Sequence, residues 1–170
     1  MELNKYILEK ATQISVCDEY AKLIPLAETA DDLLKMYVSP KGIEFCLANN
    51  FPGNEDLTKL AGDSLNVYGV YVDQSVKLSD RSFLVLLGNS HGTVAYGSYS
   101  TNQLFVKHRS SAWVTVKDHS FTLIDCFDQS EIHVSCQDSA RVSVNVYGQA
   151  KVITSGNGAV KVVHKFKETY

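Results

Sequence analysis

The most constraining feature of this sequence is an alternation of side-chain type that starts at Ser82 and keeps one parity for about 80 residues. Apolar or small residues dominate the even positions, and the odd positions between Trp113 and Lys151 carry most of the charge. Successive side chains of a β-strand point to opposite faces, so a period of two indicates strands with one buried face. Hairpin turns of variable length would change the parity often, and its constancy predicts one repeated structural unit.

The repeated unit is ten residues long in the second half of the chain, where corner residues recur at Asp118, Asp128, Asp138 and Gly148. Each unit contains a small residue, two β-branched positions and then Asp or Gly. A corner carboxylate can accept local backbone N–H bonds, and glycine can adopt the positive φ that a tight corner needs. Two units would build a flat coil of about twenty residues and three a triangular coil of about thirty; the repeat is compatible with both.

We therefore predict a mainly β fold, in which residues 65–170 form a short right-handed parallel β-helix (a β-solenoid) and residues 1–64 a small α-helical cap segment. The alternative is a β-sandwich. A sandwich needs hairpin signals such as Asn-Gly, and only Asn157–Gly158 supplies one. The absence of proline after Pro52 agrees with strands that are paired on both sides.

The N-terminal segment, as far as about Gly62, has helical apolar spacing, which predicts three or four short helices. Thr29 or Asp31 is expected to cap a helix through DDLLKMYV, and Pro40 is expected in the first turn of the next helix. Asn54 is expected to cap one more short helix. The segment NVYGVYVD, residues 66–73, is rich in β-branched and aromatic residues and predicts a strand.

The charge and cysteine content narrow the classes of partner. The formal net charge is −3 with dispersed Lys and Arg, which argues against a nucleic-acid partner and against binding to an anionic membrane. The sequence has no signal-peptide pattern and no long apolar run, so we expect a cytoplasmic protein. Its four cysteines form no C-x-x-C pair, which predicts reduced thiols, no metal site and no cofactor. Cys126 and Cys136 are interpreted as small inward apolar residues.

Two segments resemble known proteins. GNSHGTVAYG (residues 88–97) and DSARVSVNVYG (residues 138–148) resemble the G-N-S/A-x-V-x-A-Y repeats of short parallel β-helix proteins of bacterial and phage genomes. GIEFCLANNFPG (residues 42–53), followed by YGVYVD, is similar to the N-terminal part of uncharacterised proteins from phages and mobile elements of gut Bacteroidetes. The resemblance implies a β-helix and a phage or mobile-element origin, with virion association as one location. That family has no assigned activity, so no catalytic residue is carried over.

Three polar residues are weak candidates for a cluster on the outer wall: Asp125, Glu131 and His133. Gathered in one groove, they could support a β-helix enzyme that acts on polysaccharide. An ordinary polar outer face explains the same residues more simply. We therefore assign no catalytic residue and predict a non-enzymatic protein.

Aromatic side chains at odd positions are the stronger candidates, because the parity places them outside the solenoid. The set comprises Phe105, Trp113, Phe121, Phe127 and Tyr147. An exposed apolar patch usually marks an interface, and the N-terminal helices, a second subunit or a sugar ring could cover it. The leading hypothesis is a structural or interaction protein that self-associates or docks a protein partner. The first alternative is a glycan-binding module that uses these aromatics.

Overall fold

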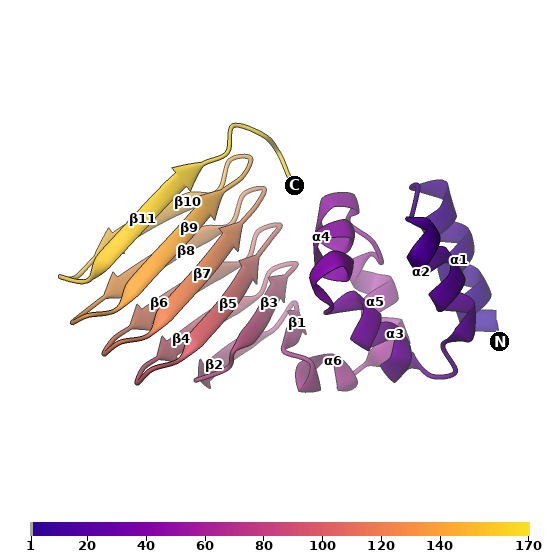
Figure 1. Cartoon of the computed structure of the whole chain (residues 1–170), viewed down its shortest axis with the longest axis horizontal. Coiled ribbons are helices and arrows are strands. Elements are labelled where there is room, and N and C mark those ends of the chain that lie inside the picture. Colours follow the sequence, from indigo (N-terminus) through magenta and orange to yellow (C-terminus); the bar gives the residue numbers. More distant parts are fainter. Residues whose placement is uncertain (1) are drawn as a thin grey trace. The chain divides into compact units, whose positions relative to one another are not determined.

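The computed structural model describes residues 2–170, with side chains from Lys5 onward, and the chain divides into two compact units. The first unit extends to Tyr68 and the second runs from Gly69 to Thr169. Figure 1 shows helices in the first unit and two layers of strands in the second. The change from helix to strand was therefore predicted within a few residues of its position.

The N-terminal unit is built from short helices. They are α1 (Glu2–Gln13), α2 (Asp18–Leu23), the 3-10 turn η1 (Ile24–Leu26), α3 (Ala30–Tyr37), α4 (Pro40–Asn49), α5 (Asn54–Ala61) and α6 (Ser64–Val67). Isolated helices of this length are unstable in water, so they depend on packing. Ile7, Ala11 and Ile24 form a buried cluster, against which Leu33 and Phe51 pack.

Local sequence signals set most of these helix ends. The hydroxyl of Thr29 accepts the Asp32 N–H at 3.2 Å while Oδ2 of Asp32 accepts the Thr29 N–H at 3.0 Å, a complete capping box that confirms Thr29 as the cap of α3. Pro40 lies in the first turn of α4, as predicted. The cap predicted for α5 was wrong by one residue. Gly53 holds that position without a side-chain bond, and Asn54 is already helical.

Gly42 shows why α3 and α4 can meet so closely. A Cβ at this position would lie 1.9 Å from the carbonyl oxygen of Met36, a backbone atom that cannot move aside easily. Only glycine allows this approach, so the turn between the two helices requires it.

The second unit is a parallel β-solenoid, and the β-sandwich alternative is wrong. Its strands are β1 (Val70–Val72), β2 (Ser75–Ser79), β3 (Phe83–Leu87), β4 (His91–Tyr96), β5 (Thr101–Val106), β6 (Ser111–Val116), β7 (Phe121–Cys126), β8 (Glu131–Cys136), β9 (Arg141–Val146), β10 (Lys151–Ser155) and β11 (Ala159–His164). Sheet A has the order β1-β3-β5-β7-β9-β11 and sheet B the order β10-β8-β6-β4-β2. The strand expected over residues 66–73 was too long, because α6 occupies its first part.

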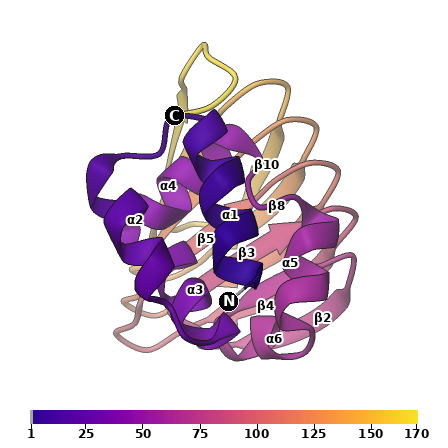
Figure 2. The same ribbon diagram turned by 90° about the vertical axis from the view of Figure 1, so that its right-hand side faces the viewer.

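The register settles the number of strands per coil. Thr101 pairs with Phe121, and Phe121 pairs with Arg141, so one coil takes 20 residues and contains one strand of each sheet. The coil is flat, and the triangular alternative is excluded. Figures 1 and 2 show the strands of each sheet side by side and the corner loops of successive coils in rows.

The even positions fill the interior, as the parity predicted. Inward residues in both sheets have almost no exposed surface; examples are Leu84, Leu104, Val114, Ile124, Ile132 and Val144. Each central coil therefore stacks branched side chains on those of the coils on either side.

The corners confirm the role predicted for aspartate. The backbone of Asp118, Asp128 and Asp138 has φ between 58° and 60°, the left-handed region. The Asp118 carboxylate accepts the N–H of Ser98 at 2.7 Å, and the N–H of Asp118 donates to Asp138 at 3.3 Å. Each corner carboxylate thus binds the backbone of the preceding coil.

Candidate functional sites

The five candidate aromatics do not form one surface. Trp113 lies on the outer face of sheet B with 61% of its surface exposed, and Phe121 lies on the outer face of sheet A with 40% exposed. Phe105 is also on sheet A but is buried. Phe127 and Tyr147 are buried at corners between strands. The expectation of an exposed aromatic wall was wrong for these last three residues. Strand parity does not govern the corner positions of Phe127 and Tyr147, and Phe105 packs against the ring of Phe83 with centroids 5.6 Å apart.

The two buried corner rings, Phe127 and Tyr147, stack on each other, and the ammonium group of a lysine lies near each of them. The rings of Phe127 and Tyr147 lie 4.7 Å apart with an interplanar angle of 15°. Nζ of Lys107 lies 5.2 Å from the centre of the Phe127 ring, and Nζ of Lys167 lies 5.8 Å from that of Tyr147. Lys107 also pairs with Asp128 at 3.2 Å. This arrangement stabilises a corner, and its buried rings are not available to a ligand.

The outer face of sheet B is where an exposed aromatic ring meets polar groups. The Trp113 ring stacks on His133 with centroids 4.1 Å apart and an interplanar angle of 6°, because the two residues are in register on β6 and β8. Nε2 of His133 lies 2.8 Å from Glu131. A shallow groove of about 130 Å³ runs beside this stack, lined by residues that include Thr115, Ser135, Ile153 and Ser155.

The three weak polar candidates do not converge. Glu131 and His133 lie together on β8 of sheet B, whereas Asp125 lies on β7 of sheet A and accepts a hydrogen bond from Asn145 at 2.6 Å. The buried interior separates the outer faces of the two sheets. The groove expected for a polysaccharide-acting enzyme is therefore not formed by these residues.

The two interior cysteines also lie apart. Cys126 ends β7 and Cys136 ends β8, and consecutive strands of a flat coil end at opposite corners. Burial raises the pKa of the Cys126 thiol to about 12 and also raises that of Cys136. Both behave as the small apolar residues that the repeat predicted.

The last coil of the solenoid has two unpaired edges. Among the described residues, β10 pairs only with β8 and β11 only with β9. After β11 the chain follows the corner of the preceding coil, where the Lys167 carbonyl accepts the N–H of Gly148. Val162 has the inward parity of Val144, its neighbour on β9, yet 38% of its surface is exposed against 0% for Val144. The interior is therefore partly open at this end.

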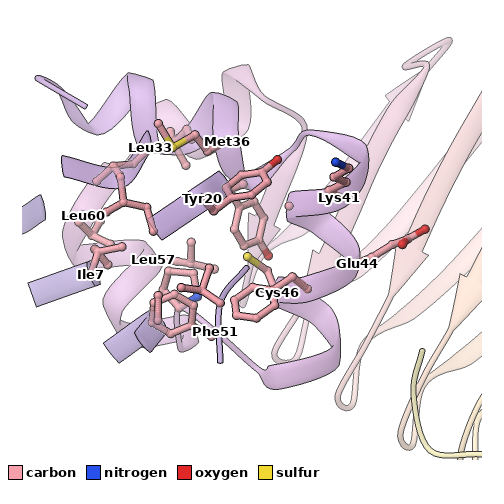
Figure 3. Close-up of a pocket in the computed structure, with 18 of the residues that line it drawn as sticks. Ile7, Tyr20, Leu33, Met36, Lys41, Glu44, Cys46, Phe51, Leu57 and Leu60 are labelled. Carbon is pink, nitrogen blue, oxygen red and sulfur yellow. The ribbon is translucent and has the colours of Figure 1, made fainter. Parts of the chain in front are cut away.

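The helical unit contains a cavity of about 380 Å³ between α1, α2, α3, α4 and α5. Figure 3 shows Ile7 and Leu60 on one side, Lys41 and Glu44 on the other, and Cys46 with aromatic rings between them. Burial raises the pKa of the Cys46 thiol to about 12, so it is protonated and unreactive near neutral pH.

Sequence reasoning missed this cavity and the exposed corner residue Tyr99, which stacks on His119 with centroids 4.9 Å apart. The helical apolar spacing indicated that the short helices share a core. It carried no information on whether their side chains fill that core.

None of the helices in residues 2–170 is long and apolar enough to cross a membrane. Within the same residues, no group of three or more His, Cys, Asp or Glu side chains is arranged to hold a metal ion. Comparison with protein-family models, with curated proteins and with solved structures finds no match to this chain.

Proposed function

We propose that this chain is a non-enzymatic interaction protein whose solenoid assembles end to end with a second copy through its last coil. The observation that supports this most directly is the pair of unpaired edges on β10 and β11, together with the exposed interior valine at Val162. An open strand edge offers a row of unsatisfied backbone groups to another chain.

The direction of the free backbone groups follows from the ladder. The N–H groups of Ala159 and Lys165 donate to the preceding coil, and so does that of Lys151. Successive residues of a strand present their backbone groups to opposite sides, so Thr154, Val160 and Val162 turn theirs to the free edge. Each edge can therefore bind a strand without losing a bond to its own coil.

A twofold axis perpendicular to both sheets would place each edge antiparallel to the same edge of the second copy. If Val162 faces Val162 of the copy, Lys161 lies opposite Val163 and the two lysine side chains are not directly opposed. The half-exposed valines of the two copies would then continue one interior.

The test is light scattering after size-exclusion chromatography over a concentration series. We expect the mass to rise from 18.8 kDa toward about twice that value as the concentration increases. Thr154→Pro and Val162→Pro remove N–H groups that face the free edge and should keep the protein monomeric. Trp113→Ser is the matched control, because it alters an exposed residue away from that end.

Two results contradict this proposal. One is a wild-type protein that stays monomeric at the highest concentration. The other is association that Trp113→Ser removes and the two proline variants leave intact, which would assign the interface to the outer face of sheet B.

A second candidate function is glycan binding at that outer face. The specific observation is the exposed ring of Trp113 beside the hydroxyl groups of Thr115 and Ser135, a combination that suits the apolar face and the hydroxyls of a sugar. Screening of wild type and Trp113→Ala against a glycan array tests it. Absence of binding, or binding that the variant retains, rules this function out.

A further inference from the structure

The cavity of the helical unit has the size of a ligand pocket. Protein interiors are close-packed, and a space of about 380 Å³ is not an ordinary packing defect. Small-molecule sites occupy roughly 300–1,000 Å³, and an engineered apolar cavity of only about 150 Å³ stays dry and binds benzene. An apolar molecule is therefore the natural occupant.

The lining of the cavity favours an aliphatic chain. Its apolar wall includes Ile7, Leu33, Met36, Leu57 and Leu60, all flexible or branched side chains that pack well on methylene groups. Of these residues, Ile7 and Leu57 are buried, and Leu33, Met36 and Leu60 are half-buried.

Two polar side chains, Tyr20 and Lys41, line the opposite side of the cavity. The Tyr20 hydroxyl forms a hydrogen bond with Ser39, and Nζ of Lys41 lies 2.9 Å from the carboxylate of Glu19. Figure 3 places Tyr20 between this side and the apolar wall. A head group here can pair with the ammonium of Lys41 and still reach water, because 73% of the Lys41 side chain is exposed.

We propose that the cavity binds a single-chain acyl ligand, with its aliphatic chain toward Leu60 and Ile7 and its carboxylate head at Tyr20 and Lys41. Burial of the chain provides most of the affinity, since transfer of methylene groups from water is favourable. Lys41 favours a carboxylate over a neutral head, although the Glu19 carboxylate, 2.9 Å from its Nζ, competes for the ammonium and weakens that preference.

The test is isothermal titration calorimetry of the full chain with decanoic acid and, in parallel, 1-decanol. We expect saturable binding of one decanoic acid per chain. Leu60→Trp and Ala61→Phe add volume at the apolar side and should each weaken binding at least about tenfold. Leu26→Trp, at an exposed position outside the cavity, is the matched control and should bind as the wild type does.

Thermal unfolding distinguishes a filled cavity from a damaged fold. A variant that fills the cavity should melt, without ligand, at the wild-type temperature or above it, and two variants keep the test valid if one fails to fold. Lys41→Gln should weaken binding of decanoic acid and leave that of 1-decanol unchanged. The proposal is overturned if the wild type binds neither compound saturably, if both filling variants bind like Leu26→Trp, or if Lys41→Gln affects neither compound.

Discussion

At the scale of single residues, the solenoid depends on the corner side chains that reach back one coil. Asp118 combines two demands at one position, because its backbone has φ 60° and its carboxylate accepts the N–H of Ser98. Aspartate and asparagine tolerate the left-handed region better than other non-glycine residues. The recurrence of Asp at the corners therefore has a conformational and a hydrogen-bonding cause.

Substitutions at Asp118 separate these causes. Asp118→Asn keeps an acceptor oxygen and tolerance of positive φ, so we expect a small change in the free energy of unfolding. Asp118→Gly loses the hydrogen bond and makes the unfolded chain more flexible, whereas Asp118→Ala loses the bond and adds backbone strain at φ 60°. The loss in the free energy of unfolding should therefore be largest for alanine, at about 1–3 kcal/mol. Urea denaturation measures the series, and equal stability of the glycine and alanine variants would contradict the role of φ.

His108 takes the same place in the other row of corners, where its Nδ1 accepts the N–H of Gly88 at 3.0 Å. Burial lowers the pKa of His108 from its ordinary 6.5, although the Asp128 carboxylate opposes this shift. The unfolded chain therefore binds the proton at higher pH than the folded chain. Stability is fully present above pH 6.5 and is lost as the pH falls through the folded-state pKa.

His108→Asn isolates this titration, because asparagine keeps an acceptor and tolerates φ 64°. As the pH is lowered from about 7.5 to about 5, we expect the free energy of unfolding to fall more in the wild type than in His108→Asn. The reason is that histidine at position 108 gains a proton in this range and asparagine does not. The denaturant midpoints of both proteins are measured at both pH values. The two proteins share all other titratable groups, so the contributions of these groups cancel when the two pH dependences are subtracted. An identical pH dependence of the two proteins would mean that His108 is protonated without cost in the fold.

At the scale of the strand, parity decides which side chains stabilise the fold. Leu104 lies inside the solenoid between Leu84 and Ile124, with no exposed surface, and Gln103 beside it points outward. Leu104→Ala should lower the free energy of unfolding by about 2–5 kcal/mol, through lost burial and the cavity left behind. Gln103→Ala should change it by no more than about 0.5 kcal/mol. Comparable losses in chemical denaturation would contradict the two-faced strand.

The strands were predictable from the sequence because their alternation is long and regular. The number of strands in each coil was not predictable. A ten-residue repeat fits two or three strands per coil, and the choice depends on how sharply each corner turns. Phe127 and Tyr147 show the same limit. They lie at corners, where side-chain direction follows the turn and not the strand, so parity assigned them wrongly to the surface. The cavity of the helical unit depends on how short helices pack, which apolar spacing alone does not specify.

At the scale of the whole molecule, a stack of repeats has a stability profile along its axis. Each coil contacts only its neighbours, so a central coil is held on both sides and the last coil on one. The amides of β5 to β8 should therefore exchange slowest with deuterated solvent, and those of β10 and β11 should exchange faster. The helices of the N-terminal unit are short and should open independently of the central coils.

The same measurement tests how the last coil is used. In the monomer, the N–H groups of Thr154 and Val162 face the free edge and have no ladder partner, so they should exchange fast at low protein concentration. Association through this end gives them partners and should slow their exchange as the concentration rises, while the central coils show no change. In Val162→Pro the amide of Thr154 should stay fast at every concentration. Protection that appears instead around Trp113 on β6 would place the contact on the outer face of sheet B and leave the end of the solenoid open.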